Sequence, residues 1–175
     1  MRNSENYVVS FFDNLKNVFP IYSIDIREIL EEIRNGKWKS EIESCRIDLN
    51  KKKDLPCFTP SGIFHKRNSS GLEKYTGIIC LDIDNVEDPE RLKNLCKSIP
   101  WIWAAFITPS GKGLKIIVQT IPELNDFPRL EAEVALAFYK YTGFLRDEKC
   151  KDLARVQFVS FDQDIYLNQK PEIYK

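Results

Sequence analysis

An apolar run that ends in two acids, residues 77–84 with the sequence GIICLDID, constrains the fold more than any other segment. Its length and isoleucine content predict a buried strand, and side chains alternate between the two faces of a strand. We therefore expect Asp82 and Asp84 on the same face, at the end of the strand. Carboxylates this close repel each other unless a proton or a cation lies between them, and Mg²⁺ takes such ligands together with phosphate oxygens. The plain alternative is a strand end whose acids only face water.

The pattern that follows this run predicts strands and helices in the order βαββαβ. This order is the split βαβ arrangement of ferredoxin-like sheets, so we expect an α+β fold. In that topology the first and third strands are central neighbours, and the last strand pairs with the first at an edge. The expected strands are 77–84, 101–108, 114–120 and 155–161, and the expected helices are 88–97 and a helix from 125 or 126 to 142.

A length of 175 residues suits one domain with a substantial core. We divide it into an N-terminal α/β portion, residues 1–75, and a core, residues 76–175. In the first portion, isoleucines at helical spacing predict a helix that Ser23 or Asp25 caps and Gly36 ends. A shorter element is expected at 38–47. The remainder, 48–75, is expected to be loop with a short strand at 55–58.

The predicted sheet places further polar residues near the two acids. If the isoleucines and leucine of 79, 81 and 83 face the helices, both acids stand on the opposite, open face. On the third strand the alternation puts Lys115 on that same face. An ammonium beside two carboxylates suits an anionic, metal-bound ligand such as a triphosphate.

The turn before the third strand contains two glycines, in the sequence SGKGLK of residues 110–115. Such a turn can direct backbone amides toward one point and form an anion nest. Ser110 adds a hydroxyl, and Lys112 and Lys115 add charge; Gly111 and Gly113 permit the turn. The spacing of a Walker loop is absent, and a strand follows rather than a helix. A simple hairpin is the alternative interpretation.

Two acids after the long predicted helix, Asp147 and Asp152, compete for the place of a third carboxylate. Two-metal phosphoryl chemistry generally holds its ions about 4 Å apart between several carboxylates. The last predicted strand would bring either acid toward Asp82 and Asp84. Arg155, at the start of that strand, is expected either to bind a phosphate or to pair with one of these acids.

The charge balance argues against a protein that coats nucleic acid nonspecifically. Lys and Arg number 26, Asp and Glu also number 26, and the pI is about 6.6; such coats are usually strongly basic. Any contact must then rest on local patches. The loop His65-Lys66-Arg67 is one candidate for contact with a phosphate backbone, with an exposed loop histidine as the alternative, and the lysines 51–53 are another, with a solvated loop as the alternative.

The cysteines and the hydropathy pattern bear on the compartment. Five cysteines without a C-x-x-C pair argue against a zinc site and a disulfide framework, and for a reducing cytoplasm. No apolar run approaches the roughly 20 residues that cross a bilayer, and a signal peptide is not expected. We expect a cytoplasmic protein without a membrane association.

Together these segments resemble the archaeo-eukaryotic primase-polymerase superfamily. More narrowly, they are similar to the primase-like N-terminal domain of virulence-associated-E-type proteins of bacteria and their mobile elements. The resemblance rests on the order of five segments and spans most of the chain. They are LPCFTPSGIF at 55–64, DID at 82–84, SGKGLK at 110–115, Asp147 with DLAR at 152–155, and FVSFD at 158–162.

The resemblance implies an RRM-like catalytic sheet and template-directed nucleotidyl transfer with Mg²⁺ or Mn²⁺. Asp82 and Asp84 match the metal ligands of the first motif, and residues 110–115 match the turn for the incoming nucleoside triphosphate. Asp147, or alternatively Asp152, matches the third acid. Lys115 stands where the superfamily commonly has histidine; the narrower family also has lysine there. The implied partners are a single-stranded nucleic-acid template and a helicase, in cis or in trans.

Two other functions are weighed against this one. A primase fold that has lost catalysis and only binds nucleic acid or a partner protein fits the lysine at 115 and the neutral charge. A haloacid-dehalogenase-like phosphatase fits residues 79–86, which match its hydrophobic-D-x-D-x-V opening, and residues 106–108, which resemble its second motif. The predicted β-α-β-β order, however, lacks the repeated crossovers of that enzyme's doubly wound parallel sheet.

Overall fold

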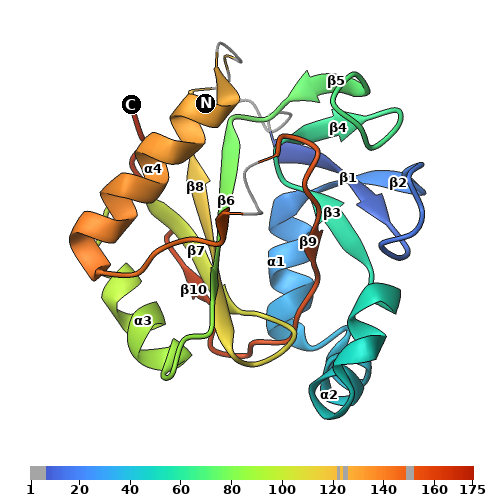
Figure 1. Cartoon of the computed structure of the whole chain (residues 1–175), viewed down its shortest axis with the longest axis horizontal. Helices are drawn as coiled ribbons and strands as arrows, with labels where there is room; N and C mark the ends of the chain where they lie inside the picture. Colours follow the sequence, from blue (N-terminus) through green and yellow to red (C-terminus); the bar gives the residue numbers. More distant parts are fainter. Residues whose placement is uncertain (1–6, 122, 124–125, 149–151) are drawn as a thin grey trace.

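The chain folds into two antiparallel sheets flanked by helices, an α+β architecture (Figure 1). The structure is a computed structural model that describes residues 7–121, 123, 126–148 and 152–175. One sheet has the strand order β10-β7-β8-β6, the other has the order β2-β1-β3-β9, and β4 and β5 form a separate hairpin. Within the described residues, no helix is long and apolar enough to cross a membrane.

The sheet that carries the acids contains three of the four strands in the expected arrangement. β6 (Ile78–Asp84) and β7 (Ile102–Ile107) both pair antiparallel with β8 (Gly113–Gln119) between them. Two helices, α3 (Pro89–Cys96) and α4 (Phe127–Thr142), cover one face, as Figure 1 shows. The side chains of Asp88 and Asp126 cap their N-termini, and α4 ends at Gly143 with φ 76°.

The apolar row predicted to face these helices does so. Ile79, Leu81 and Ile83 lie in one buried cluster with Leu92 of α3 and Phe138 of α4. The period-two alternation therefore assigned the two faces of β6 correctly, because a strand places successive side chains on opposite sides.

The second sheet belongs mainly to the N-terminal portion. It consists of β1 (Val8–Phe12), β2 (Tyr22–Asp25), β3 (Cys57–Thr59) and β9 (Gln157–Phe158), and it packs with α1 (Ile26–Asn35). The other elements of this portion are α2 (Lys39–Ile47), the 3₁₀ helix η2 (Leu49–Asp54), β4 (Gly62–Phe64) and β5 (Leu72–Tyr75). Asp25, one of the two predicted candidates, caps α1, and Gly36 ends the helix as predicted, in the left-handed conformation.

The prediction of helices and loops for this portion missed most of its strands. β1 and β2 form a hairpin where no strand was expected, and β4 and β5 lie inside the expected loop 48–75. These strands have three to five residues. Alternation over so few residues does not stand out, and the strands gain their stability from pairing with segments distant in the chain.

The last predicted strand does not join the sheet that carries the acids, which corrects the expected topology. Within this segment only Gln157 and Phe158 form a strand, β9, which pairs with β3. Phe158 lies opposite Cys57, and Gln157 lies opposite Phe58. Val159, the next residue, is buried in the core of the N-terminal portion. The partly buried Phe158 packs against the same core. β10 (Tyr166–Leu167) pairs with β7, at the other edge of the sheet that carries the acids.

The face of β6 opposite the helices is covered over most of its length, so it is not the open face that was expected. Ile78 and Cys80 share a buried cluster with Val9, Phe11 and Ile29 of the N-terminal portion. The strand is thus apolar on both faces until Asp82, which is typical of a strand buried on both sides. Only the end that carries the acids reaches solvent.

The described cysteines, Cys45, Cys57, Cys80 and Cys96, are buried thiols, as expected for small apolar core residues. Burial raises the pKa of the Cys57 and Cys96 thiols to about 12. The fifth, Cys150, lies outside the described residues.

Candidate active site at the end of β6

The two acids lie where β6 ends. Asp82 is largely buried and Asp84 is exposed, on the same side of the strand. Directly after them Asn85 has φ 56°, the left-handed region that few residues other than glycine adopt readily. The chain then returns to the neighbouring turn, where the Val86 N–H donates to the Lys112 carbonyl at 3.0 Å. This sharp turn ends the ladder and leaves Asp84 at the tip of the sheet.

Lys115 lies on the same face as the acids, as predicted, but its side chain points into the protein. It stands opposite Asp82 in the β6–β8 ladder, and its Nζ donates to Asp82 Oδ2 at 2.8 Å and also to the Gln157 side-chain oxygen. Only 2% of Lys115 is exposed. Its direct effect is to hold the Asp82 carboxylate, while the expected contact with a phosphate stays a prediction.

Asp147 reaches this strand end from the segment after α4. Its backbone N–H donates to the Asp82 carbonyl oxygen at 2.8 Å. The pKa of the Asp84 carboxyl is raised. Burial is the largest cause, and the charges of Asp82 and Asp147 raise the pKa further. Lys52 and Lys115 act in the opposite direction. Three carboxylates therefore interact electrostatically at one end of the sheet.

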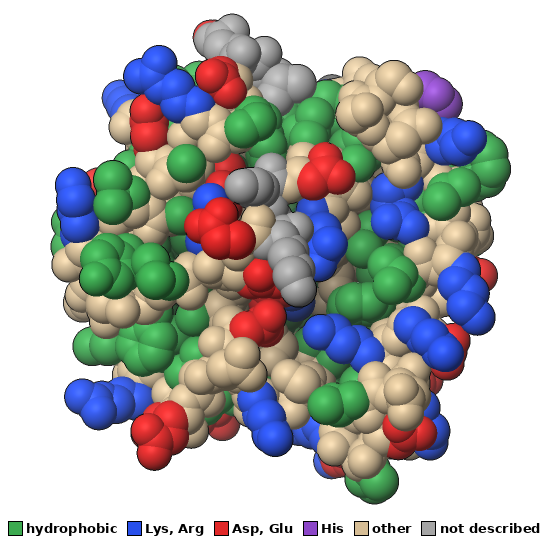
Figure 2. Space-filling view, viewed as in Figure 1, with side chains coloured by type: hydrophobic (Ala, Val, Ile, Leu, Met, Phe, Trp, Pro, Cys, Tyr) green, Lys and Arg blue, Asp and Glu red, His purple; other side chains and the backbone are tan. Residues whose placement is uncertain are grey.

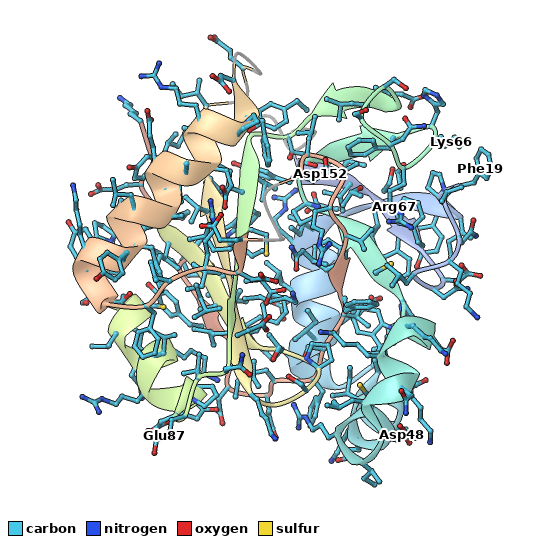
Figure 3. The ribbon with its side chains drawn as sticks, viewed as in Figure 1. Phe19, Asp48, Lys66, Arg67, Glu87 and Asp152 are labelled. Carbon is cyan, nitrogen blue, oxygen red and sulfur yellow. The ribbon has the colours of Figure 1, made fainter. Side chains whose placement is uncertain are left out.

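The alternative third acid, Asp152, is placed differently. Its side chain accepts the Ala154 N–H at 3.1 Å and its carbonyl accepts the Arg155 N–H at 3.0 Å, so it closes its own turn. Figure 3 shows it at the loop that precedes β9. Asp152 and Arg155 line a small hollow with Ser61 and Cys80, on the covered face of β6. Asp147 thus contacts the strand end at Asp82, whereas Asp152 lies by the covered face of β6, and Arg155 is exposed.

The glycine-containing turn forms the neighbouring wall of the site. Ser110 Oγ lies 3.1 Å from Thr108 Oγ1 and accepts the Lys112 N–H at 3.3 Å, while Gly111 has φ 74°. A Cβ on Gly113 would lie 2.5 Å from the Ile83 carbonyl oxygen, so glycine permits β8 to approach β6 beside Asp84. Lys112 is exposed at this turn.

Two cations of the N-terminal portion lie near the acids and the turn. The sequence did not assign them to this site. Lys52 of η2 lowers the pKa of Asp84, and its Nζ lies 5.5 Å from the Phe158 ring centroid. Arg46 of α2 donates to the Phe161 carbonyl at 3.1 Å, and its Nε would lie 3.5 Å from a Cβ on Gly111. Figure 2 shows acidic side chains along the middle of this face, with Lys and Arg beside them toward α2 and β3.

The loop His65-Lys66-Arg67 is separate from these acids in sequence and in its contacts. Arg67 is used within the fold: its guanidinium donates to the Leu15 carbonyl at 2.6 Å and lies 5.7 Å from the Phe12 ring centroid. His65 faces Glu73 at 3.9 Å with both side chains exposed. The proposed nucleic-acid contact of this loop therefore depends on Lys66 more than on Arg67.

The donor set at the end of β6 suits a hard cation. Within the described part of the chain no three His, Cys, Asp or Glu side chains form a ready-made metal cluster. Asp82 and Asp84 nevertheless offer carboxylate oxygens, which Mg²⁺ and Mn²⁺ prefer, and after burial the negative charges of Asp82 and Asp147 contribute to the raised pKa of Asp84. Asp82 and Asp84 thus provide two oxygen donors of the kind such an ion takes, and Asp147 contacts this strand end through its backbone N–H.

A comparison with known families identifies the chain. The sequence model of a family described as "BT4734-like, N-terminal domain" matches residues 50–167, more than half of the chain. The chain belongs to this family. The match covers the three acids, the glycine-containing turn and Lys52. No curated protein and no solved structure matches the chain. Since the family's description states no activity, the function has to be argued from the site.

Proposed function

We propose that this member of the BT4734-like N-terminal domain family is a metal-dependent nucleotidyltransferase of the primase-polymerase type. One observation carries the proposal: carboxylates and cations interact electrostatically at one end of a sheet. The charges of Asp82 and Asp147 raise the pKa of Asp84, those of Lys52 and Lys115 lower it, and Arg46 lies beside Gly111 of the turn. A triphosphate bound through a divalent cation needs both kinds of group within a short span.

Each residue has a distinct role in this proposal. Asp82 and Asp84 would hold Mg²⁺ or Mn²⁺, and Asp147 would add a third carboxylate. When bound, the cation would neutralise the triphosphate and assist attack by a 3′-hydroxyl. Lys52 and the turn residues Ser110 to Lys112 would bind phosphate oxygens.

Lys115 has an indirect role. Because its ammonium donates to Asp82 Oδ2, it fixes the orientation of that carboxylate and prevents it from rotating away. We assign the same protein class that the sequence resembles, the primase-like domain of virulence-associated-E-type proteins. A single-stranded template, a helicase partner and a cytoplasmic location belong to this proposal as well.

Nucleotide incorporation on a single-stranded template, with and without Mn²⁺, tests the proposal. We expect metal-dependent product from the native chain and none from the variant that combines Asp82→Ala with Asp84→Ala. The matched control combines Asp164→Ala with Glu172→Ala, two exposed acids elsewhere, and should retain the native activity. Synthesis by the Asp82/Asp84 variant at the native rate would refute the assignment.

A second candidate function is a primase-type domain that has lost catalysis, and one contact favours it. The Lys115 ammonium, 2.8 Å from Asp82, already supplies positive charge to a proposed metal ligand. A domain that binds without catalysis would then keep the fold and lose metal-dependent nucleotide binding. Titration with Mn²⁺ and a labelled nucleoside triphosphate separates the two candidates, since only the enzyme requires the metal for tight binding.

The phosphatase alternative receives no support from the fold. It requires a doubly wound parallel sheet, whereas each pairing between the named strands is antiparallel. We therefore do not propose it.

A further inference from the structure

Two loops of the N-terminal portion form one surface that the proposed active site does not use. We define the two-loop surface as residues 13–21, between β1 and β2, and residues 65–71, between β4 and β5. The Arg67 N–H donates to the Val18 carbonyl at 2.8 Å, and the Arg67 guanidinium donates to the Leu15 carbonyl. These bonds join the loops, so their outward side chains keep a defined arrangement.

Two large apolar side chains are exposed on this surface. Phe19 is 56% exposed and Ile21 is 50% exposed, although phenylalanine and isoleucine are normally buried. Lys66 from the other loop lies with its Nζ 5.6 Å from the Phe19 ring centroid. Figure 3 shows Phe19 and Lys66 next to each other at the rim of the molecule, with Arg67 further in. An aromatic ring and an ammonium are therefore presented together to solvent.

The surface is also connected to the acids through η2. The Leu15 N–H donates to the Lys53 carbonyl at 3.1 Å. The neighbouring Lys52 lowers the pKa of Asp84 through its positive charge. Lysines 51–53 thus lie between the two-loop surface and the end of β6. In the two loops Lys16, Lys66 and Arg67 are opposed by a single acid, Asp13, in a chain whose net charge is zero.

An exposed aromatic ring beside a cationic path is the arrangement that binds single-stranded nucleic acid. Bases stack on aromatic rings while basic side chains contact the phosphates, and the binding tolerates any sequence. We propose that the two-loop surface docks a single strand, with one base on Phe19, phosphates on Lys66 and the η2 lysines, and the strand leading to the acids. Its direction toward the acids rests on the proposed function, whereas the docking itself does not.

Anisotropy of a fluorescent oligothymidylate, without metal or nucleotide, tests the docking. Phe19→Ala should weaken binding about tenfold, because a base that stacks on an aromatic ring contributes that order of affinity. The matched control is Leu136→Ala on α4, where another large apolar side chain is 53% exposed, and it should bind like the native chain. Equal affinity of Phe19→Ala and Leu136→Ala would overturn the proposal.

The salt dependence separates the role of Lys66 from that of Phe19. Removal of one phosphate contact on a single strand lowers the slope of log affinity against log salt by about 0.7. Lys66→Ala should show this change, while Phe19→Ala and the control Lys140→Ala on α4 should keep the native slope. An unchanged slope for Lys66→Ala would remove Lys66 from the docking surface and contradict the proposal.

Further measurements identify the ligand and separate the docking proposal from the proposed enzyme function. An oligouridylate in parallel tells RNA from DNA, and binding of either supports the docking. Binding of anionic lipid vesicles that depends on Phe19, without oligonucleotide binding, would overturn it in favour of a membrane. Strand binding without synthesis by the native chain would refute the enzyme and leave the docking intact.

Discussion

Two buried lysine–aspartate pairs in this protein have similar contact distances and different surroundings. In each, the lysine is 2% exposed and its Nζ lies 2.8 Å from a carboxylate oxygen: Lys93 with Asp162, and Lys115 with Asp82. Asp162 also accepts the Ile107 N–H at 2.9 Å and the Asp164 N–H at 3.1 Å. Its oxygens are used by donors within the fold, so this pair acts as a structural connection.

The pair at Asp82 is surrounded by negative charge instead. Asp84 and Asp147 lie nearby, and the Asp82 side chain is 13% exposed against 4% for Asp162. A carboxylate that faces other carboxylates at an accessible strand end is poised for a cation, whereas one surrounded by N–H donors is not. The same ion pair thus serves the fold in one place and supports a site in the other, and the neighbours decide which.

The largest expected effect on stability is that of Asp162→Ala. The substitution leaves the buried Lys93 ammonium without its main partner, which costs roughly 3–5 kcal/mol of unfolding free energy. Glu90, which lies 3.1 Å from Lys93 but is half exposed, compensates little. Urea unfolding measures the change, with Asp164→Ala as a control that should match the native chain. A loss below about 1 kcal/mol would contradict the structural role of this pair.

A smaller loss is expected for Lys115→Met, about 1–3 kcal/mol, because the Asp82 carboxylate it leaves behind has access to water. This variant sharpens the comparison through its response to metal. Mn²⁺ can supply the charge that the ammonium supplied, so it should raise the melting temperature of Lys115→Met more than that of the native chain. Lys93→Met should gain nothing from Mn²⁺. Equal responses of the two variants would contradict the difference between the pairs.

The smallest expected effect is a pH dependence of stability from Asp84. Burial, followed by the charges of Asp82 and Asp147, holds its pKa in the folded protein above the ordinary value. Below the ordinary pKa, Asp84 is protonated in both the folded and the unfolded state, and no unfolding free energy is lost. As pH rises through the raised folded pKa, the folded protein must ionise a disfavoured carboxylate, so unfolding free energy falls and then stays level.

Asp84→Asn should lack this fall. Urea unfolding of both proteins from about pH 3 to about pH 7, the range in which carboxyl groups titrate, measures the difference. The Asn variant should be the more stable of the two at neutral pH and no different at the acidic end. Parallel profiles would show that Asp84 is not electrostatically crowded.

Much of the sheet that carries the acids could be predicted from the sequence. Residues 77–84 alternate so that one row faces two helices, and the aspartates at 88 and 126 cap those helices. These signals are local: strand alternation, helical spacing and capping each operate within a few residues. The same locality placed Asp82, Asp84 and Lys115 on one face, and all three lie there.

The placements that failed depend on contacts between distant segments. β9 pairs with β3 because Phe158 and Val159 have a core to enter there, and that core is built from strands too short to recognise in the sequence. Lys52 and Arg46 reach the site from η2 and α2, and no spacing along the chain relates them to Asp84.

By itself, the sequence determined that two acids end a buried strand beside a glycine-containing turn. Only the tertiary structure decided what surrounds them. It buried Lys115 against Asp82, brought the Asp147 N–H to the Asp82 carbonyl, and covered the face that was expected to be open. The physical reason is that alternation fixes which face a side chain takes, while the apolar surfaces of the whole chain decide what packs against that face.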